Sequence, residues 1–257
     1  MYTPDYTIDR DSISDEEWAE RCELAALYRL VAHFRMTDLI DTHISVRVPG
    51  EEGYFLINRY GVLFHEMRAS DLVKVDIHGN IVDPRLSPDS INRAGFNIHS
   101  AVHNAREDVA CVVHTHTSAG IAVAALEEGL LPISQHALKY YGCLSYHDYE
   151  GIALNPDERS RLVADLGSNQ AMILRNHGLL AVGGSIAEAF NQLYFLERAC
   201  QAQVAALAGG RQLRYPPREV CELTARQHRD EIDCGLHLLA WESTKRLIEE
   251  QKAAYCS

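Results

Sequence analysis

Apolar side chains recur at helical spacing close to the N-terminus. Ser14 and Glu17 have the spacing of a capping box, in which each side chain pairs with a backbone N–H of the other residue. The residues that then share one helical face are Leu24, Leu27, Tyr28, Val31 and Phe34. This pattern predicts an amphipathic helix over about 14–36, preceded by an extended arm of residues 1–13.

Alternation of apolar and polar residues follows and predicts strands over 43–48, 54–58 and 73–77. The third is expected to turn through 78–80 into a hairpin with 81–83. Residues 110–116 are expected to form a half-buried strand and 171–176 a buried one. Further helices are expected from Asp89 or Ser90 to about 106, over 118–129 with Gly129 as its end, over 156–167 with Pro156 at its start, over 186–207, and around Trp241 near the C-terminus.

Strands and helices are interleaved, but tight turns join several of the strands. A doubly wound parallel sheet needs helical crossovers and does not fit this order. We therefore predict an α/β protein with three layers, α/β/α, around a central mixed and largely antiparallel sheet. No repeat or linker divides the sequence, so residues 14–257 are expected to form a single domain.

The composition indicates which kinds of binding partner are disfavoured. The chain of 257 residues carries 36 acidic and 24 basic residues, a formal net charge of −12, which disfavours binding to nucleic acid. No apolar run has the ~20 residues of a membrane span, and the polar, acidic N-terminus lacks the pattern of a signal peptide. Seven cysteines without a CxxC pair indicate a reducing compartment. We expect a cytoplasmic protein that binds neither nucleic acid nor membrane.

Three histidines are the candidates for metal ligands. His114 and His116 are two residues apart on a predicted strand, so their side chains project from the same face. Neutral imidazole is a good ligand for zinc, iron and copper. His177 follows the next buried strand in the sequence Asn176-His177-Gly178. The alternative interpretation is that these are polar residues on an exposed sheet face, because spacing alone does not bring His177 to the other two.

The sequences around these histidines resemble a known family. CVVHTHTSAGIAVAALEEGLLPISQHALKYYGCLSYHDYEGIAL (111–154) and AMILRNHGLLAVGGSIAEAF (171–190) resemble adducin head domains. INRAGFNIHSAVHNAREDVACVVHTHT (91–117) and FLINRYGVLFHEMRASDLVKVDIHGNIV (55–82) resemble the core and the N-terminal sheet of the class II aldolase/adducin family. The resemblance covers most of the chain. It implies that His114, His116 and His177 hold a divalent metal, zinc above all, with manganese or iron as alternatives.

The resemblance also shows what this sequence lacks. The family's metal-binding, acid/base glutamate aligns with Gly95, which cannot carry a proton, so the catalytic acid/base is unknown. Its phosphate-binding serines align with Arg93 and Ala94, and its Gly-Asn phosphate contact aligns with Thr42-His43. These replacements imply the loss of sugar-phosphate chemistry. Substitute bases, judged by nearness to the motifs, are Glu66, Asp89, His99, His136, His147 and Asp148.

Several other groups have a functional and a structural interpretation. His99 and His103, at i,i+4 spacing, could bind a second metal or be one buried and one exposed histidine. Asp148 could orient His147 or form a surface turn with it. Arg59 and Arg175 could hold a substrate carboxylate or be surface ion-pair partners. Residues expected to be packing groups rather than catalysts are Tyr140, Tyr141, Tyr146, Tyr149, Cys111 and Cys143.

The leading hypothesis is a metal-dependent lyase that performs aldol cleavage or decarboxylation on a small, oxygenated, non-phosphorylated substrate. The alternatives are a non-catalytic scaffold domain, as in adducin, and an Fe(II)-dependent oxygenase. The resemblance further implies a homotetramer. The helix over 186–207 is apolar on more than one side, so its second partner is either a neighbouring subunit or its own domain.

Overall fold

A single mixed sheet forms the centre of the protein. The computed structural model describes residues 6–152 and 157–257, and the strands found there pair in the order β3-β2-β1-β4-β7-β6-β5. They are β1 (His43–Arg47), β2 (Tyr54–Ile57), β3 (Val73–Asp76), β4 (Cys111–Thr115), β5 (Ser145–His147), β6 (Ala171–Leu174) and β7 (Gly178–Gly183). Each neighbouring pair is antiparallel except β5 with β6. The predicted mixed, largely antiparallel sheet is confirmed.

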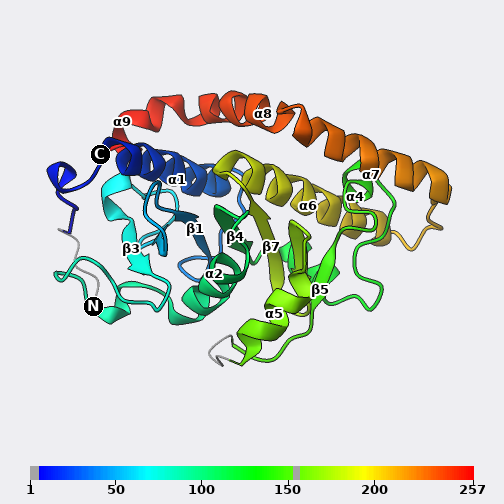
Figure 1. Ribbon diagram of the computed structural model, residues 1–257. Coiled ribbons are helices and arrows are strands. Elements are labelled where there is room, and N and C mark those ends of the chain that lie inside the picture. The colour runs from blue at the N-terminus through cyan, green and yellow to red at the C-terminus, as the bar shows by residue number, and fades with distance from the viewer. Residues whose placement is uncertain (1–5, 153–156) are drawn as a thin grey trace.

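Helices cover both faces of this sheet (Figure 1). One face packs against α1 (Asp15–His33), α3 (Ser118–Ala124) and α6 (Ile186–Leu207), and the other against α2 (Arg93–Ala105) and α5 (Glu158–Leu166). Alternate residues of β4 belong to different cores, because Val113 packs with α1 and α6 whereas Val112 packs with α2 and α5. The three layers are confirmed, and β4 is buried on both faces rather than half-buried.

An outer run of helices lies over α1 and α6 (Figure 1). It comprises α7 (Arg218–Asp233), α8 (Leu236–Lys245), the 3-10 segment η4 (Arg246–Gln251) and α9 (Lys252–Tyr255). Trp241 anchors the run: its ring packs edge-on against Phe190 of α6, and its Nε1 donates to Glu23 of α1 at 2.6 Å. The predicted helix around Trp241 is confirmed as α8. The prediction omitted α7, a mostly polar helix whose buried residues are Cys221 and Ala225 alone, so few apolar residues mark it in the sequence.

Several helices and one hairpin begin or end at residues other than those predicted. The predicted cap of α1 is confirmed, because the Ser14 side chain accepts from the Glu17 N–H. The helix α2 begins after Asn92, whose side chain caps it, and the expected start at Asp89 or Ser90 falls in the 3-10 turn η3 (Pro88–Ser90). The helix α3 ends at Ala124, before Gly129. The expected hairpin after β3 is reduced to one bridge between Val75 and Ile81.

The remaining elements are the short helix α4 (Gln135–Leu138) and the 3-10 turns η1 (Arg10–Ser12) and η2 (Ala69–Asp71). In the described part of the predicted arm, Tyr6 is buried and donates to Asp83, and the Ile8 N–H donates to the Ser70 carbonyl. Residues 1–5 and Pro156 lie outside the described residues, and the division into an arm and a domain stays a prediction. No helix in the described residues combines the length and hydropathy of a membrane span.

Candidate metal centre

The three predicted ligands come together at one end of the central strands. His114 lies on β4, His116 follows that strand, and His177 lies in the turn between β6 and β7. Because β7 is the neighbour of β4, with Leu180 opposite His114, the turn before β7 lies beside the end of β4. The sheet therefore supplies the proximity that spacing in the sequence could not show.

Two residues shape the turn that carries His177. Asn176 has a positive φ of 55°, a left-handed conformation that asparagine tolerates better than most residues. Gly178 opens β7 where a Cβ would overlap the carbonyl oxygen of Thr115 on β4. Gly178 itself has no positive φ, so Asn176 provides the tight turn, and the glycine permits close packing instead.

The three imidazoles face one another through the same ring atom. The Nε2 atoms lie 2.8 Å apart for His114 and His116, 2.9 Å for His116 and His177, and 3.3 Å for His114 and His177. Two nitrogens bound to one tetrahedral zinc at 2.0–2.1 Å would lie roughly 3.4 Å apart. Lone pairs that converge this closely repel one another unless a cation lies between them. The donor set thus fits one divalent metal ion.

The hydrogen bonds behind the ligands support the same interpretation. The Nδ1–H of His114 donates to the Leu179 carbonyl at 2.9 Å, which leaves its Nε2 free of a proton. The Nδ1 of His116 lies 3.1 Å from the Asp38 carboxylate, the partner that metal-binding histidines commonly have. Burial, then the neighbouring His177, holds the pKa of His114 well below its usual value; burial, then His116, lowers the pKa of His177 to about 4. Both are therefore neutral at pH 7 and able to bind metal.

These ligands open onto a cavity of about 530 Å³. Its wall also carries Tyr60, Arg93, Tyr149 and two acidic residues, Asp38 and Asp41. Sequence reasoning missed Asp38, and it noted Arg93 only as a replaced phosphate-binding serine. Tyr149, which we expected to be a packing residue, is exposed at the cavity, with its ring centroid 6.1 Å from that of His177.

Gly95 is buried directly after the lining residues Arg93 and Ala94, and it lies against a residue from another element. A Cβ at position 95 would lie 2.6 Å from Cγ of His43, and closer still to two other atoms of that ring. The imidazole of His43 therefore occupies the space that a side chain on α2 would need. The sequence gives no direct signal for this pairing, because strand β1 and helix α2 are far apart in the chain.

The substitute bases considered from the sequence do not line this cavity within the described residues. His99 is fully buried behind it, with both ring nitrogens hydrogen-bonded. His136 stacks on Phe195, and Glu66 and Asp89 are exposed elsewhere. His147 lines a small adjoining pocket and pairs with Asp165 at 2.7 Å. Asp148, which we considered as the partner of His147, is exposed.

Three other functional interpretations are not supported by the contacts. His99 and His103 are both buried, and the hydroxyl of Ser45 lies between them, where a second metal would have to bind. Arg59 is buried against the Tyr6 ring, so it fits neither a residue that holds a substrate carboxylate nor a surface ion-pair partner. Arg175 donates to the Leu126 carbonyl and stacks on Tyr146, away from the metal cavity.

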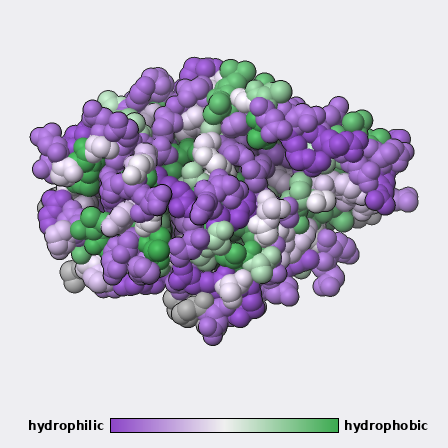
Figure 2. Space-filling model, in the orientation of Figure 1, coloured by the Kyte–Doolittle hydropathy of each residue, from purple (hydrophilic) through white to green (hydrophobic). Residues whose placement is uncertain are grey.

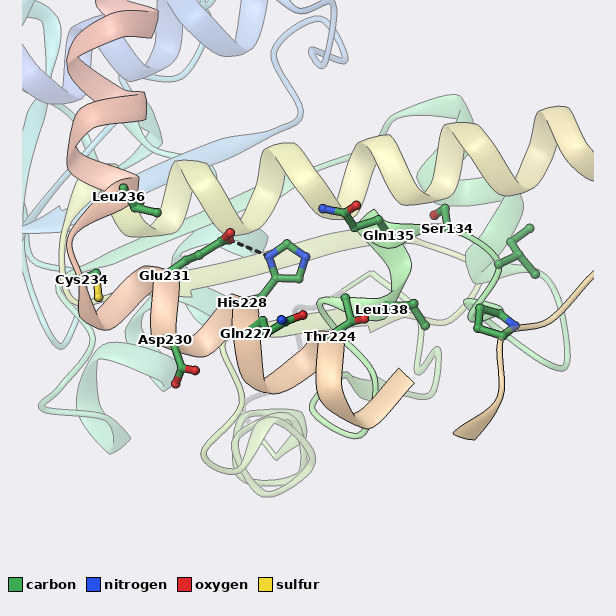
Figure 3. A pocket seen from close by; sticks show the side chains of 12 residues that line it. Ser134, Gln135, Leu138, Thr224, Gln227, His228, Asp230, Glu231, Cys234 and Leu236 are labelled. Atoms are coloured by element: carbon green, nitrogen blue, oxygen red, sulfur yellow. Dashed lines mark hydrogen bonds and ion pairs between the residues drawn. The ribbon is translucent and has the colours of Figure 1, made fainter. Parts of the chain in front are cut away.

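A second cavity, of about 680 Å³, lies between α7 and the segment that carries α4 (Figure 3). His228 points into it and pairs with Glu231 at 2.9 Å. In the described residues, the one cluster of side chains able to hold a metal is His114, His116 and His177. The cavity at those histidines is therefore the candidate functional site.

Comparison with known proteins agrees with this fold. The family description "Class II Aldolase and Adducin N-terminal domain" matches residues 22–204, and the chain belongs to this family. A Caulobacter vibrioides protein, whose name assigns it provisionally to the class 2 aldolases, is 49% identical over 251 residues, which cover 96% of this chain and 95% of that protein. Mouse alpha-adducin is 48% identical over 189 residues, which cover 73% of this chain but 26% of the adducin.

Solved structures show the same similarity. A crystal structure of an aldolase II superfamily protein from Pseudomonas syringae superposes with a TM-score of 0.90 at 50% identity, covering 98% of this chain and all of that one. L-fuculose 1-phosphate aldolase from Glaciozyma antarctica superposes with a TM-score of 0.81 at 26% identity, covering 93% of this chain and 92% of that one.

The contact between Gly95 and His43 predicts an unusual response to alanine. Replacing a glycine with alanine inside an ordinary helix is stabilising by about 0.5–1 kcal/mol. Here we expect net destabilisation of about 1–3 kcal/mol, because the new methyl group overlaps the His43 ring. Urea denaturation measures the free energy of unfolding. The control is Gly209→Ala, where the nearest atom outside the chain neighbours is 3.6 Å from a Cβ and little change is expected. Equal stability of both variants would contradict the clash.

The buried His103 predicts acid sensitivity. Burial, then the charge of Arg47, lowers its pKa from 6.5 to about 3, so between these values the unfolded chain binds a proton that the folded chain does not. The free energy of unfolding should therefore decrease as the pH falls below 6.5, with His103 contributing at most about 1.4 kcal/mol per pH unit. Denaturation at pH 7.5 to 4.5 should show a shallower slope for His103→Gln than for the exposed-site control His65→Gln. Identical slopes would exclude this contribution.

Proposed function

We propose that this protein is a metal-dependent lyase that performs aldol cleavage or decarboxylation on a small, oxygenated, non-phosphorylated substrate. The observation that carries the proposal is the convergence of three imidazole Nε2 atoms on one point at the wall of an open cavity. Structural zinc sites are usually closed by four protein ligands, whereas catalytic sites have three ligands and an open position. The arrangement of His114, His116 and His177 is of the catalytic kind.

The metal that we expect at these ligands is zinc, and manganese or iron would accept the same nitrogen donors. A divalent metal supplies a Lewis acid there, which stabilises negative charge on a substrate oxygen. His114 and His116 are oriented for this by Leu179 and Asp38. The exposed Arg93 guanidinium on the same wall is suited to a carboxylate of the substrate, since its planar donors match a carboxylate in two hydrogen bonds.

A scaffold function without chemistry is the second candidate, and a specific observation favours it. The similarity to alpha-adducin covers 73% of this chain, and position 95 is a glycine that cannot serve as acid/base. An Fe(II)-dependent oxygenase is the third candidate, because three histidines around an open position also suit iron. Identification of the bound metal separates the lyase from the oxygenase, and absence of any bound metal favours the scaffold.

We also propose a homotetramer, as the family resemblance implies. The helix α6 no longer supports it, because its second apolar side packs against α8 of the same chain. Exposed apolar residues on the outer helices support an interface instead: Leu236, Leu238 and Leu239 of α8 and Leu223 of α7. In Figure 2, hydrophobic groups appear along the edge where Figure 1 places α8. A cytoplasmic location, and the absence of nucleic-acid and membrane partners, stay predictions.

Protein purified without a histidine tag should contain one divalent metal ion per chain, measured by elemental analysis. The double variant His114→Ala/His116→Ala should contain none, because it removes two of three ligands. The matched control His65→Ala/His78→Ala removes two histidines outside the cavity and should keep full occupancy. A triad variant that retains stoichiometric metal would show that the ion binds elsewhere.

Sugar phosphates should not be turned over. Arg93, Ala94 and His43 stand where the resemblance places phosphate-binding groups, and Gly95 stands where it places the acid/base. A coupled assay with L-fuculose 1-phosphate and ribulose phosphates, on zinc-, manganese- and iron-loaded protein, should give rates at background. The L-fuculose 1-phosphate aldolase from Glaciozyma antarctica is the positive control. Turnover comparable with that control would refute the loss of phosphate recognition.

Light scattering at micromolar concentration should give about four times the chain mass of 28.8 kDa. If α8 forms the interface, replacing the exposed Leu239 with glutamate should dissociate the assembly, since a buried unpaired charge is costly. Leu39→Glu, at an exposed leucine in the loop between α1 and β1, is the control. A monomer for the unmodified chain would contradict the tetramer.

A further inference from the structure

His43 stands beside the metal ligands but is not one of them. It opens β1 opposite His114 on β4, and the two ring centroids are 5.0 Å apart. Its Nδ1 lies 2.8 Å from Nε2 of His99. Its Nε2, at the other edge of the ring, has no hydrogen-bond partner among the described residues and is accessible from the cavity that His43 lines. One ring nitrogen is therefore held from behind while the other can meet a ligand.

The contact between His43 and His99 is the first link of a hydrogen-bonded chain. His99 Nδ1 lies 2.6 Å from the Ser45 hydroxyl, and that hydroxyl lies 2.7 Å from Nε2 of His103. All four residues are at most 3% exposed. This burial holds the pKa of each of the three imidazoles well below its usual value. Three neutral rings and one hydroxyl thus form a continuous line from the cavity into the space between the sheet and α2.

The chain ends in a group that can only accept a hydrogen bond. Nε2 of His103 is bonded to Ser45, so the hydrogen bond between the His103 ring and the Val109 carbonyl belongs to Nδ1. A carbonyl oxygen cannot donate, and Nδ1 of His103 therefore carries the proton. The same carbonyl accepts from Arg47 Nε at 2.8 Å, which its second lone pair permits.

The proton at that end fixes the position of every other proton in the chain. A neutral imidazole has one N–H and one acceptor nitrogen, and a hydroxyl donates once. Nε2 of His103 must then accept, so the Ser45 hydroxyl donates to it. The hydroxyl oxygen accepts from the Nδ1–H of His99, and Nε2 of His99 accepts from the Nδ1–H of His43. The proton of His43 is therefore on Nδ1, and its Nε2 presents a lone pair to the cavity.

We propose that Nε2 of His43 accepts a hydrogen bond from a hydroxyl group of the substrate, and that the chain behind it holds His43 in this tautomer. The inference rests on the proposed function and narrows its substrate class: with Arg93 lining the same cavity, the site suits a small hydroxy acid. A ligand without a donor would leave the nitrogen unpaired, so the site disfavours it. His99, Ser45 and His103 are positioning residues, since they act through His43.

The tautomer can be tested on the metal-free protein by neutron crystallography, which locates exchanged deuterium atoms. We expect deuterium on Nδ1 of His43 at pH 7.5. Ser45→Ala should move it to Nε2, because the Nδ1–H of His99 then has no acceptor, and a buried donor without an acceptor is the costlier arrangement. The control Ser100→Ala removes a buried hydroxyl outside the chain and should leave the deuterium in place. Deuterium on Nε2 of His43 in the unmodified protein would overturn the proposal, and so would an unmoved deuterium in Ser45→Ala.

The hydrogen bond itself can be tested with glycolate and methoxyacetate. Both probes carry a carboxylate and an oxygen on the next carbon, but only glycolate has a hydroxyl donor. Calorimetry on zinc-loaded protein should show a preference for glycolate that falls about 3–10-fold in Ser45→Ala, the range for one hydrogen bond between neutral groups. Ser45 is buried behind His43, so the wall of the cavity is unchanged. Ser100→Ala should retain the preference. An unchanged preference in Ser45→Ala with full zinc content would overturn the proposal.

His43→Phe covers the case in which the serine variant fails to fold. It retains a ring but removes the acceptor, so it should lose the same preference for glycolate, and an unchanged preference would again overturn the proposal. The two tests also separate this inference from the proposed function. If the unmodified protein takes up no zinc, the lyase proposal fails, and the deuterium position still decides whether His43 presents an acceptor. If zinc binds at one ion per chain but neither variant alters the preference, the metal site stands and the role of His43 fails.

Discussion

The antiparallel pairing of β4 with β1 on one side and with β7 on the other determines where every group of the site lies. His114 has His43 of β1 opposite it on one side and Leu180 of β7 opposite it on the other. The turn that carries His177 therefore ends beside His116. A shift of one residue in either pairing would turn the side chains to the other face of the sheet. The close approach of Gly178 to Thr115 permits this register, because a larger residue could not open β7 there. The site is therefore a property of the central three strands, and the helices complete its walls.

Helix α2 shapes the site because it has no side chain at Gly95. Its N-terminal turn carries Gly95 against His43. Its later turns carry His99, which is hydrogen-bonded to His43, and His103, which is hydrogen-bonded to the Ser45 hydroxyl. The acidic residues of the cavity come instead from the loop between α1 and β1, where Asp38 contacts His116. Around the three ligands, one wall is thus cationic or neutral, with Arg93 and His43, and another is acidic. A substrate would meet these walls in a fixed orientation.

For the three candidate metal ligands the sequence carries local signals, and the sheet brings them together. Two histidines at strand spacing project together, and a histidine beside a turn lies at the end of a strand. His43 and Asp38 carry no such signal, since their roles depend on which strand pairs with β4 and on how the preceding loop returns to it. Alternation placed β1, β2 and β3 to within one residue, whereas β5 and β7 were not predicted. The helix α7 was missed because it is mostly polar, with only Cys221 and Ala225 buried. The pairing of His147 with Asp165 rather than Asp148 likewise depends on α5 packing beside β5.

The contact between His43 and Gly95 constrains the order in which such a site can change. The two positions share one volume, so a large side chain on β1 and a side chain on α2 exclude each other. A lineage that exchanged an acidic residue at position 95 for an imidazole at position 43 could not pass through an intermediate that holds both. It could pass through one that holds neither, with the space filled by solvent and the metal ligands intact. In that route the glycine appears first, and a protein that stopped there would retain its fold and its three clustered histidines.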